Sequence, residues 1–394
     1  MKLCFACDEY PPGPHGGIGS LVQIMARGLA GAGHDVRVAG LYPASYPAPD
    51  YEEDGGVRVW RLRLPAGRRG WIGARIRLYR LIRRWVASGD VDLVEVPDYG
   101  APAAFWPGLA VPVVARLSGS TTFFRSEMGR PADRGTRILE RASLRRADFI
   151  LSESRYLEER TRAVFSLGGE PGEVIYNPVD LPAPGPAIPR ERFSVMFAGT
   201  LTEKKGIVSL VRAWPAVARA HPGALLHIWG KDGIAPAGGS MQSYLGTLIP
   251  TDLAATVVYH GHVPLERLLG AFRTAGMAVL PSYAEGFALT PLHAMAAGCP
   301  VVYTKRGSGP ELITDGVTGL LVDPGSPEEI ASAICRLLGE PAGADRIGDA
   351  GRLHVEKNFS RATILAQNER YYLKCLARFG ADRHTRKKDH GNAH

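Results

Sequence analysis

The sequence predicts an α/β protein with two doubly wound parallel sheets, and three observations lead to that prediction. The chain has 394 residues, more than the length at which one hydrophobic core usually stops growing. Short apolar runs alternate with helical patterns, which is typical of parallel βαβ units. The alternation breaks at the proline-rich stretch LPAPGPAIPRER, residues 181–192, and then restarts. Because proline fixes φ and disfavours helix before it, this stretch is a stiff connector between two domains.

The first half of the chain contains apolar, β-branched runs that we expect to form strands. They span residues 2–7, 35–41, 57–62, 92–96, 112–117, 148–153 and 173–177. Between the first two runs lies a helical pattern, residues 19–33, with apolar side chains on one face and Gly33 as the expected terminator. Strands separated by helices imply a parallel sheet.

The second half repeats the pattern. Expected strands span residues 193–199, 224–230, 256–262, 277–282, 300–304 and 319–323, and a helix is expected from about 206 to 220. The expected organisation is an N-terminal domain (1–182), a linker (183–192), a C-terminal domain (193–360), a helix returning to the first domain (361–380) and a disordered tail (381–394). Ligands of such sheets bind at the carboxyl ends of the strands, here in a cleft between the domains.

Composition narrows the class of protein. No run of 18 or more apolar residues occurs, and the start MKLCFACDEYPP lacks a signal-peptide pattern, so we expect a soluble cytoplasmic protein. The five scattered cysteines indicate reduced thiols, and Cys4 and Cys7 lie inside an apolar run with no second Cys or His pair nearby. No nucleic-acid-binding motif is present.

The net charge of +8 indicates an anionic partner. Part of the excess lies in the tail, and part lies in RRGWIGARIRLYRLIRRW, residues 68–85. At helical spacing, one face of this segment carries Arg77, Arg80 and Arg84, and another carries Trp71, Leu78, Ile82 and Trp85. Two interpretations stay open: a solvated face on a crossover helix, or a patch that contacts a membrane surface.

Glycines precede the first helix in PPGPHGGIGSLVQ. Gly17 and Gly19 let backbone N–H groups approach a ligand, and a helix N-terminus favours an anion such as a diphosphate. An ordinary glycine turn explains the same pattern.

Two loops of the second half have candidate donor-binding residues. In FAGTLTEKKGIVSL, Lys204 and Lys205 follow a strand and can neutralise a departing diphosphate, although solvated lysines are the alternative. In YHGHV, the backbone of His262 and Val263 can contact a flat ring, although a plain turn is the alternative.

The stretch AEGFALTPLHAMAAGCPVV, residues 284–302, places Glu285 just before a helix that begins near Thr290 and Pro291. His293 lies eight positions beyond Glu285, close to the same helical face.

The ordered set of motifs resembles the family 4 retaining glycosyltransferases, which have the GT-B fold of two Rossmann-like domains. The resemblance covers nearly the whole chain and is strongest in residues 195–340, through AGTL, GHV, LPSYAEGFAL, AMAAGCPVV and PELITDGVTGLLVDPGSPEEI. It implies transfer of a sugar from a nucleoside diphosphate sugar to an acceptor, with no cofactor and no metal ion. The D-x-D at Asp90 and Asp92 leads into an apolar strand, which indicates a structural role.

The resemblance also implies a set of site residues. Glu285 and Lys205 would be catalytic, and Asp98, Tyr99 and Ser118 would face the acceptor. The donor would contact Gly17, Gly19, Thr200, Lys204, Lys205, His262, Val263, Glu285, Gly286, Phe287, Ala288, Leu289, Thr290 and His293.

Three positions depart from the family pattern. Ser118 stands where many members have a histidine, Thr200 where many have a phosphate-binding arginine, and His293 where a second glutamate is usual. A neutral imidazole offers one acceptor, so we expect His293 to make one contact to the donor ribose, weakened below about pH 6.5. A histidine packed on the helix is the alternative.

The sequence thus predicts a bacterial glycosyltransferase that uses a UDP- or GDP-sugar and a small-molecule acceptor of specialised metabolism. One alternative is an envelope glycolipid or polysaccharide glycosyltransferase at the membrane surface. Others are a non-catalytic sugar-nucleotide-binding protein and an epimerase or phosphorylase of the same fold. The oligomeric state is left open.

Overall fold

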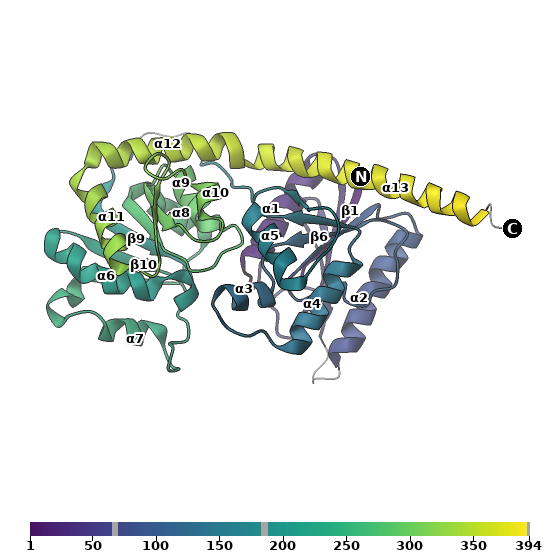
Figure 1. The fold of residues 1–394 in the computed structure, drawn as a ribbon, viewed down its shortest axis with the longest axis horizontal. Coiled ribbons are helices and arrows are strands. Elements are labelled where there is room, and N and C mark those ends of the chain that lie inside the picture. Colours follow the sequence, from purple (N-terminus) through teal and green to yellow (C-terminus); the bar gives the residue numbers. More distant parts are fainter. Residues whose placement is uncertain (65–69, 183–187, 392–394) are drawn as a thin grey trace. The chain divides into compact units, whose positions relative to one another are not determined.

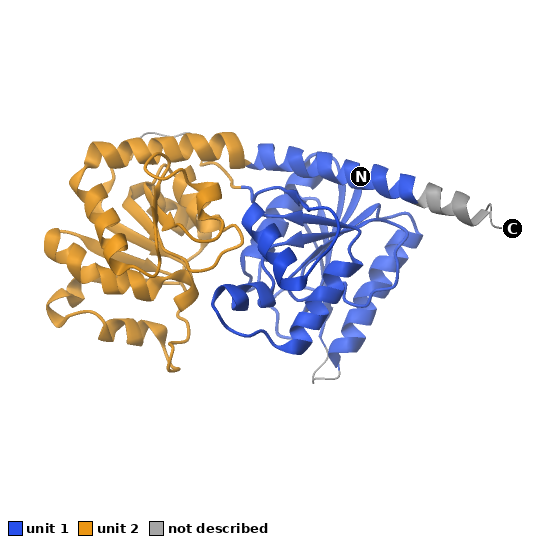
Figure 2. Ribbon diagram, viewed as in Figure 1, with its two compact units in different colours: residues 1–178, 361–394 blue, residues 179–360 orange. Residues whose placement is uncertain are grey.

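The computed structural model describes residues 1–64, 70–182 and 188–391 (Figure 1). The chain divides into two compact units, residues 1–178 with 361–394 and residues 179–360 (Figure 2). The division falls after Pro178. The sequence had predicted that the first domain ends four residues later, at 182. Residues 183–187 of the expected linker lie outside the described residues, and its last two residues begin strand β9.

Unit 1 is a doubly wound sheet with helices on both faces (Figure 1). Its strand order is β3-β4-β2-β1-β5-β6-β7-β8, parallel except for the β3–β4 pair. The strands are β1 (Lys2–Ala6), β2 (Asp35–Tyr42), β3 (Tyr51–Asp54), β4 (Val57–Arg63), β5 (Leu93–Pro97), β6 (Val113–Leu117), β7 (Phe149–Ser152) and β8 (Glu173–Val174). The helices are α1 (Gly17–Gly31), α2 (Gly70–Ala87), α3 (Thr121–Glu127), α4 (Arg134–Arg146), α5 (Arg155–Phe165) and α13 (Arg361–Gly391).

Unit 2 is a second doubly wound sheet, parallel throughout, with the order β11-β10-β9-β12-β13-β14. The strands are β9 (Glu191–Ala198), β10 (Leu225–Trp229), β11 (Val257–Gly261), β12 (Ala275–Leu280), β13 (Val301–Thr304) and β14 (Leu320–Val322). The α-helices are α6 (Ile207–Ala220), α7 (Met241–Thr247), α8 (Leu265–Thr274), α9 (Leu289–Ala296), α10 (Gly309–Leu312), α11 (Pro327–Gly339) and α12 (Pro341–Phe359). Short 3-10 helices are η1 (Glu203–Lys205) and η2 (Thr251–Thr256).

These elements confirm the predicted fold class. Each expected strand forms, because strands covered on both faces are continuous apolar runs, as in β12, whose six residues are all buried. Serine caps start several helices, and Ser120 and Ser154 each accept a backbone N–H of the following turn. Strand β3 was not predicted, because three of the four residues in its run YEED are acidic. It pairs antiparallel with β4 at the sheet edge.

Two differences concern helices. The last helix, α13, continues to Gly391, so the prediction of a disordered tail from 381 is wrong. The stretch ADRHTRKKDH has no proline or glycine to stop a helix; residues 392–394 lie outside the described residues. In α2, Leu78, Ile82 and Trp85 are buried as expected, but Trp71 is 40% exposed.

A buried polar network ties α13 to the sheet of unit 1. Arg116 on β6 donates to both oxygens of Glu95 on β5, at 2.6 and 3.1 Å, and to Asn368 of α13 at 2.6 Å. The Tyr372 hydroxyl donates to Glu95 at 2.6 Å. Because buried charges need partners, this network fixes α13 against the sheet.

Candidate active site

The strongest candidate site of unit 2 lies where its strand order reverses, between β9 and β12. Open α/β sheets bind ligands at the carboxyl ends of the strands at such a switch point. Lys205 follows β9 and Glu285 follows β12, and the Lys205 Nζ lies 2.6 Å from Oε1 of Glu285. The structure thus joins the two residues that the sequence singled out as catalytic.

A glycine allows the loop after β9 to lie close to the loop after β12. Gly206 ends η1 with φ +72°, and a Cβ there would lie 1.8 Å from the Pro281 carbonyl oxygen. Only glycine fits so close to the β12 loop in this conformation. A backbone hydrogen bond of 2.7 Å from the Tyr283 N–H to the Lys204 carbonyl joins the same two loops.

Glu285 is a buried carboxylate held in its charged form. Burial alone raises its pKa, but the positive charges of Lys205 and Lys204 and hydrogen bonds from Lys205 and Ser282 outweigh that effect, so the pKa of Glu285 is lowered. Burial lowers the pKa of Lys204, against the attraction of Glu285. The site is therefore a cluster of charges in a poorly solvated position, where charge interactions are strong.

The N-terminus of α9 follows directly after Glu285. Its first residue is Leu289, and its N-cap, Ala288, has no side chain that can accept the first N–H groups. These donors and the helix dipole favour an anion. Phe287 is buried against Phe359, with ring centroids 5.5 Å apart, so it supports this turn by packing. Gly286 is also buried, and Thr290 is half-buried.

His293 is buried within α9, with 8% of its surface exposed. Its Nδ1 has no hydrogen-bond partner among the described residues. Burial lowers the pKa of His293 to about 4, against the opposing effect of Asp180. The ring is therefore neutral at physiological pH. The sequence analysis expected its contact with the donor ribose to weaken below about pH 6.5, and the lowered pKa moves that expectation to about pH 4.

The other expected donor residues of unit 2 lie on loops after neighbouring strands. Thr200 follows β9 and is exposed, and His262 and Val263 follow β11, with His262 exposed. Among the described residues, no hydrogen bond or ion pair joins their side chains to Glu285 or Lys205. Their contact with a donor stays a prediction.

In unit 1, a carboxylate that the sequence analysis missed binds the glycine loop. Glu9 accepts the N–H of Gly16 at 3.1 Å and the N–H of Gly19 at 2.8 Å. A Cβ on Gly19 would lie 2.0 Å from the Glu9 carbonyl oxygen, whereas a Cβ on Gly17 would meet nothing within 4 Å. Gly19 is thus required by the close approach of Glu9, and Gly17 borders open space.

The residues expected to face the acceptor follow β5 and β6. Asp98 is buried and accepts the N–H groups of Ser118 and Gly119, at 3.0 and 3.2 Å, so it braces the loop after β6. Burial raises its pKa to about 7. Tyr99 is 51% exposed.

Ser118 has an unexpected partner. Its hydroxyl donates to Glu153, which also accepts from Nδ2 of Asn177 at 2.9 Å. Burial raises the pKa of Glu153 to about 7. Glu153 directly follows β7, as Ser118 follows β6. Because ligands bind at the carboxyl ends of the strands, Glu153 could have been predicted as a site residue from the sequence.

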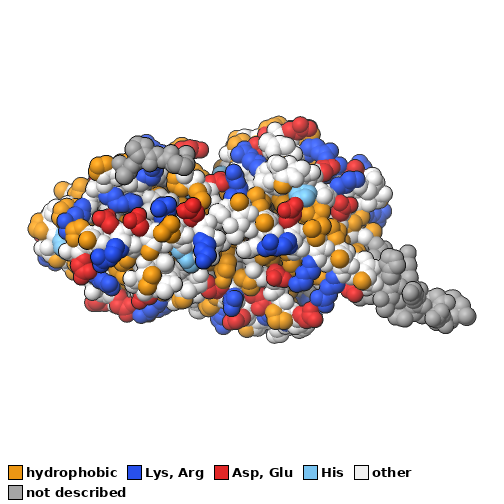
Figure 3. Space-filling model, turned by 90° about the horizontal axis from the view of Figure 1, so that it is seen from above, with side chains coloured by type: hydrophobic (Ala, Val, Ile, Leu, Met, Phe, Trp, Pro, Cys, Tyr) orange, Lys and Arg blue, Asp and Glu red, His pale blue; other side chains and the backbone are white. Residues whose placement is uncertain are grey.

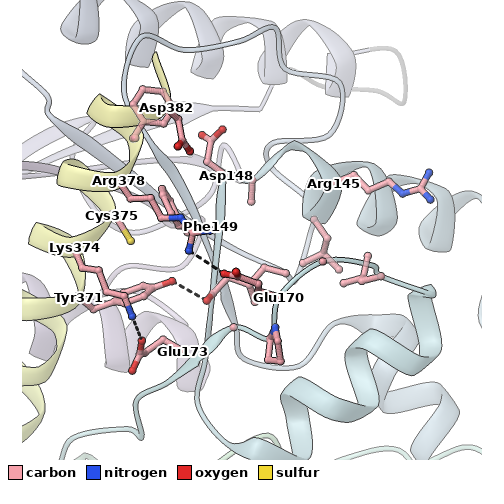
Figure 4. A pocket seen from close by; sticks show the side chains of 18 of the residues that line it. Arg145, Asp148, Phe149, Glu170, Glu173, Tyr371, Lys374, Cys375, Arg378 and Asp382 are labelled. Carbon is pink, nitrogen blue, oxygen red and sulfur yellow. Dashed lines mark hydrogen bonds and ion pairs between the residues drawn. The ribbon is translucent and has the colours of Figure 1, made fainter. Parts of the chain in front are cut away.

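None of the predicted site residues lines the cavity of about 660 Å³ in unit 1 (Figure 4). It lies between α13 and the segment 167–173. Ion pairs join the two, Lys374 to Glu173 at 3.0 Å and Arg378 to Glu170 at 2.9 Å. These pairs indicate a structural role for the cavity wall. Among the described residues, no group of three His, Cys, Asp or Glu could hold a metal ion.

Two family models match the chain on either side of the boundary between the units. The model described as "Glycosyl transferase 4-like domain" matches residues 16–178, and that described as "Glycosyl transferases group 1" matches residues 192–340. Together they span most of the chain.

Two curated relatives match over nearly their whole length. Glycogen synthase of Mycobacterium tuberculosis is 28% identical, covering 95% of this chain and 94% of that protein. The GDP-mannose-dependent alpha-(1-6)-phosphatidylinositol monomannoside mannosyltransferase of Mycolicibacterium smegmatis is 28% identical, covering 89% and 92%.

Solved structures share the fold. Sucrose-phosphate synthase from Thermosynechococcus elongatus has a TM-score of 0.78 at 22% identity, covering 95% of this chain and 99% of that one. HepE from Anabaena, in complex with UDP and glucose, has a TM-score of 0.71 at 19% identity, covering 94% and 99%. With both family models in chain order and this shared architecture, the chain belongs to the group 1, family 4-like glycosyltransferases and has the GT-B fold.

Proposed function

We propose that the protein is a retaining glycosyltransferase that moves a sugar from a UDP- or GDP-sugar to an acceptor without a metal ion. The observation that carries the proposal is the pair of Lys205 and Glu285 beside the N-terminus of α9. Relatives named for GDP-mannose dependence and a neighbour in complex with UDP and glucose support the donor class.

The proposed chemistry follows from charge. When the bond from the anomeric carbon to the diphosphate oxygen breaks, negative charge grows on the leaving diphosphate. Lys205, Lys204 and the N–H groups of α9 would stabilise it, because preorganised donors act most where charge develops. Glu285, kept ionised by the lysines, would accept hydrogen bonds from hydroxyls of the donor sugar. These groups supply the charge that a metal ion supplies in other enzymes.

Two acceptor classes are candidates. Ser118, with its hydroxyl turned to Glu153, offers lone pairs to a ligand hydroxyl, which suits a small-molecule acceptor of specialised metabolism. The exposed apolar side chains of Trp71, Ile72 and Ile76 on α2 favour instead a glycolipid or polysaccharide acceptor at a membrane surface.

The test is direct. The protein is incubated with UDP-glucose and with GDP-mannose, and released nucleoside diphosphate is measured with and without EDTA. We expect release from one donor at a rate that EDTA leaves unchanged. Once an acceptor is found, NMR of the product should show the anomeric configuration of the donor. Donor binding without release would support the non-catalytic alternative, and inversion or inhibition by EDTA would contradict the proposed mechanism.

His293 gives a separate prediction. We expect its unpartnered nitrogen to make one hydrogen bond to the donor ribose. His293→Ala should then raise the donor KM about two- to twelvefold, equal to about 0.5 to 1.5 kcal/mol for one ordinary hydrogen bond, with kcat little changed. Because the folded-state pKa is about 4, donor affinity should be constant from pH 8 to 5.5 and fall only as the pH nears 4.

The matched variant is His293→Glu, which restores two acceptor oxygens and should tighten donor binding if the ribose lies at α9. His221→Ala serves as control, since that histidine of unit 2 lies at the C-terminal end of α6. An unchanged donor KM in both His293 variants would leave His293 as a packing residue.

A further inference from the structure

The outward face of α2 carries apolar side chains beside arginines. Trp71, Ile72 and Ile76 are 40%, 59% and 46% exposed. The following turns expose Arg77, Arg80, Arg83 and Arg84. Helix α2 contains no acidic residue, so its surface charge is of one sign.

The loop after β5 adds aromatic side chains to the same region. The Arg75 guanidinium packs over the Trp71 ring at 4.5 Å and donates to the carbonyl oxygens of Gly100 and Ala101. This links the first turn of α2 to a loop whose Tyr99 and Phe105 are 51% and 71% exposed. Phe105 has φ +62°, an uncommon conformation for a bulky residue, and its ring still points to solvent.

The arginines of this face are free to bind an external anion. Arg77 donates to the Arg63 carbonyl at 2.7 Å, but no carboxylate pairs with Arg80, Arg83 or Arg84 among the residues that the structure describes. Figure 3 shows one face of the molecule, on which basic and acidic side chains are mixed. Helix α2 itself supplies arginines and no acidic side chain to balance them.

The exposed arginines and the exposed apolar side chains of α2 together fit an anionic membrane surface better than a nucleic acid. Arginines on a polar helix face attract anionic lipid headgroups, and Trp with aliphatic residues enters the headgroup–acyl boundary. A nucleic acid would use the arginines but leave Ile72 and Ile76 in water. No described helix is long and apolar enough to cross a membrane.

We propose that α2, together with the loop 99–105, docks on an anionic membrane surface. Trp71, Ile72, Ile76 and Phe105 would enter the interface, and Arg80, Arg83 and Arg84 would contact lipid phosphates. Docking brings Tyr99, a residue predicted to face the acceptor, to the membrane. The inference about the acceptor rests on the proposed function: if the protein is a glycosyltransferase, its acceptor is linked to a lipid.

The experiment is co-sedimentation of the full chain with vesicles, which does not depend on turnover. Vesicles of phosphatidylcholine with added phosphatidylglycerol should bind the protein at physiological salt, and pure phosphatidylcholine vesicles should not. Replacing Arg80, Arg83 and Arg84 by glutamine should weaken binding about a hundredfold, since each arginine near an anionic surface contributes roughly fivefold. Ile72→Ser with Ile76→Ser should weaken it roughly tenfold or more and leave the salt dependence in place.

The matched control removes the same charge elsewhere. Arg212, Arg219 and Arg346 are exposed on helices of unit 2, and their replacement by glutamine should leave vesicle binding unchanged. Thermal melting of each variant checks folding. An equal loss in this control would assign binding to net charge and overturn the proposal. So would binding to both kinds of vesicle alike, or duplex DNA binding that depends on the arginines but not on Ile72 and Ile76. Nucleoside diphosphate release is measured in parallel. It shows whether the proposed glycosyltransferase function fails, independently of vesicle binding.

Discussion

Lys205→Ala is expected to lower kcat about a hundredfold to a thousandfold, a loss of about 2.7 to 4 kcal/mol. The Lys205 ammonium lies 2.6 Å from Glu285 at the switch point of the sheet, held by the Gly206 turn. A cation aimed at the leaving diphosphate acts more in the transition state than in the ground state, so kcat falls more than donor affinity. Steady-state rates of nucleoside diphosphate release measure this effect.

Lys305→Ala is the matched control for this variant. Lys305 also follows a strand of unit 2 and pairs with a glutamate, Glu329, at 3.0 Å, but both side chains are nearly half exposed. Exposed pairs contribute little, so kcat should stay near that of the parent. If Lys205→Ala keeps kcat within a factor of about three, the role passes to Lys204 or to the N-terminus of α9.

Glu285→Gln is expected to lower turnover about tenfold to a hundredfold while nucleoside diphosphate binding survives. The amide keeps the shape of the side chain but loses the charge, and hydrogen bonds to charged groups contribute about 1.5 to 3 kcal/mol. Glu285 is buried, so solvent does not compensate for the loss. Calorimetric titration with UDP or GDP separates the two effects, and Glu329→Gln is the control.

The ion pair adds a second test for Glu285. Since Lys205 and Glu285 are in contact, the effects of the two substitutions on kcat should not add in the double variant. Additive effects would show that the two groups act separately. An equal loss of nucleoside diphosphate affinity in Glu285→Gln would make Glu285 a scaffold residue of the α9 turn.

The fold could be predicted from the sequence because it depends on local patterns. Parallel strands buried on both faces leave continuous apolar runs, as in β12, and these runs alternate with amphipathic helices. Lys205 and Glu285 each follow such a strand. Because ligands of open α/β sheets bind at the carboxyl ends of the strands, both residues could be singled out from the sequence. Strand β3 was missed because three of its four residues are acidic, and its stability comes from pairing with β4.

The contacts of the site residues depended on the tertiary structure. Lys205 and Glu285 are 80 positions apart, Glu153 lies 35 positions from Ser118, and Glu9 binds a loop that follows it; no periodicity encodes such pairs. The pKa of His293 near 4 arises from burial among segments distant in sequence, as does the buried charge of Glu285. In α2, helical spacing placed Trp71 with the core residues, yet the sheet covers only the later turns of the helix. The sequence by itself therefore determined the order of elements and the residue types at strand ends. Tertiary packing decided the ion pairs, the protonation states and the exposed face of α2, because each depends on which distant groups exclude or replace water.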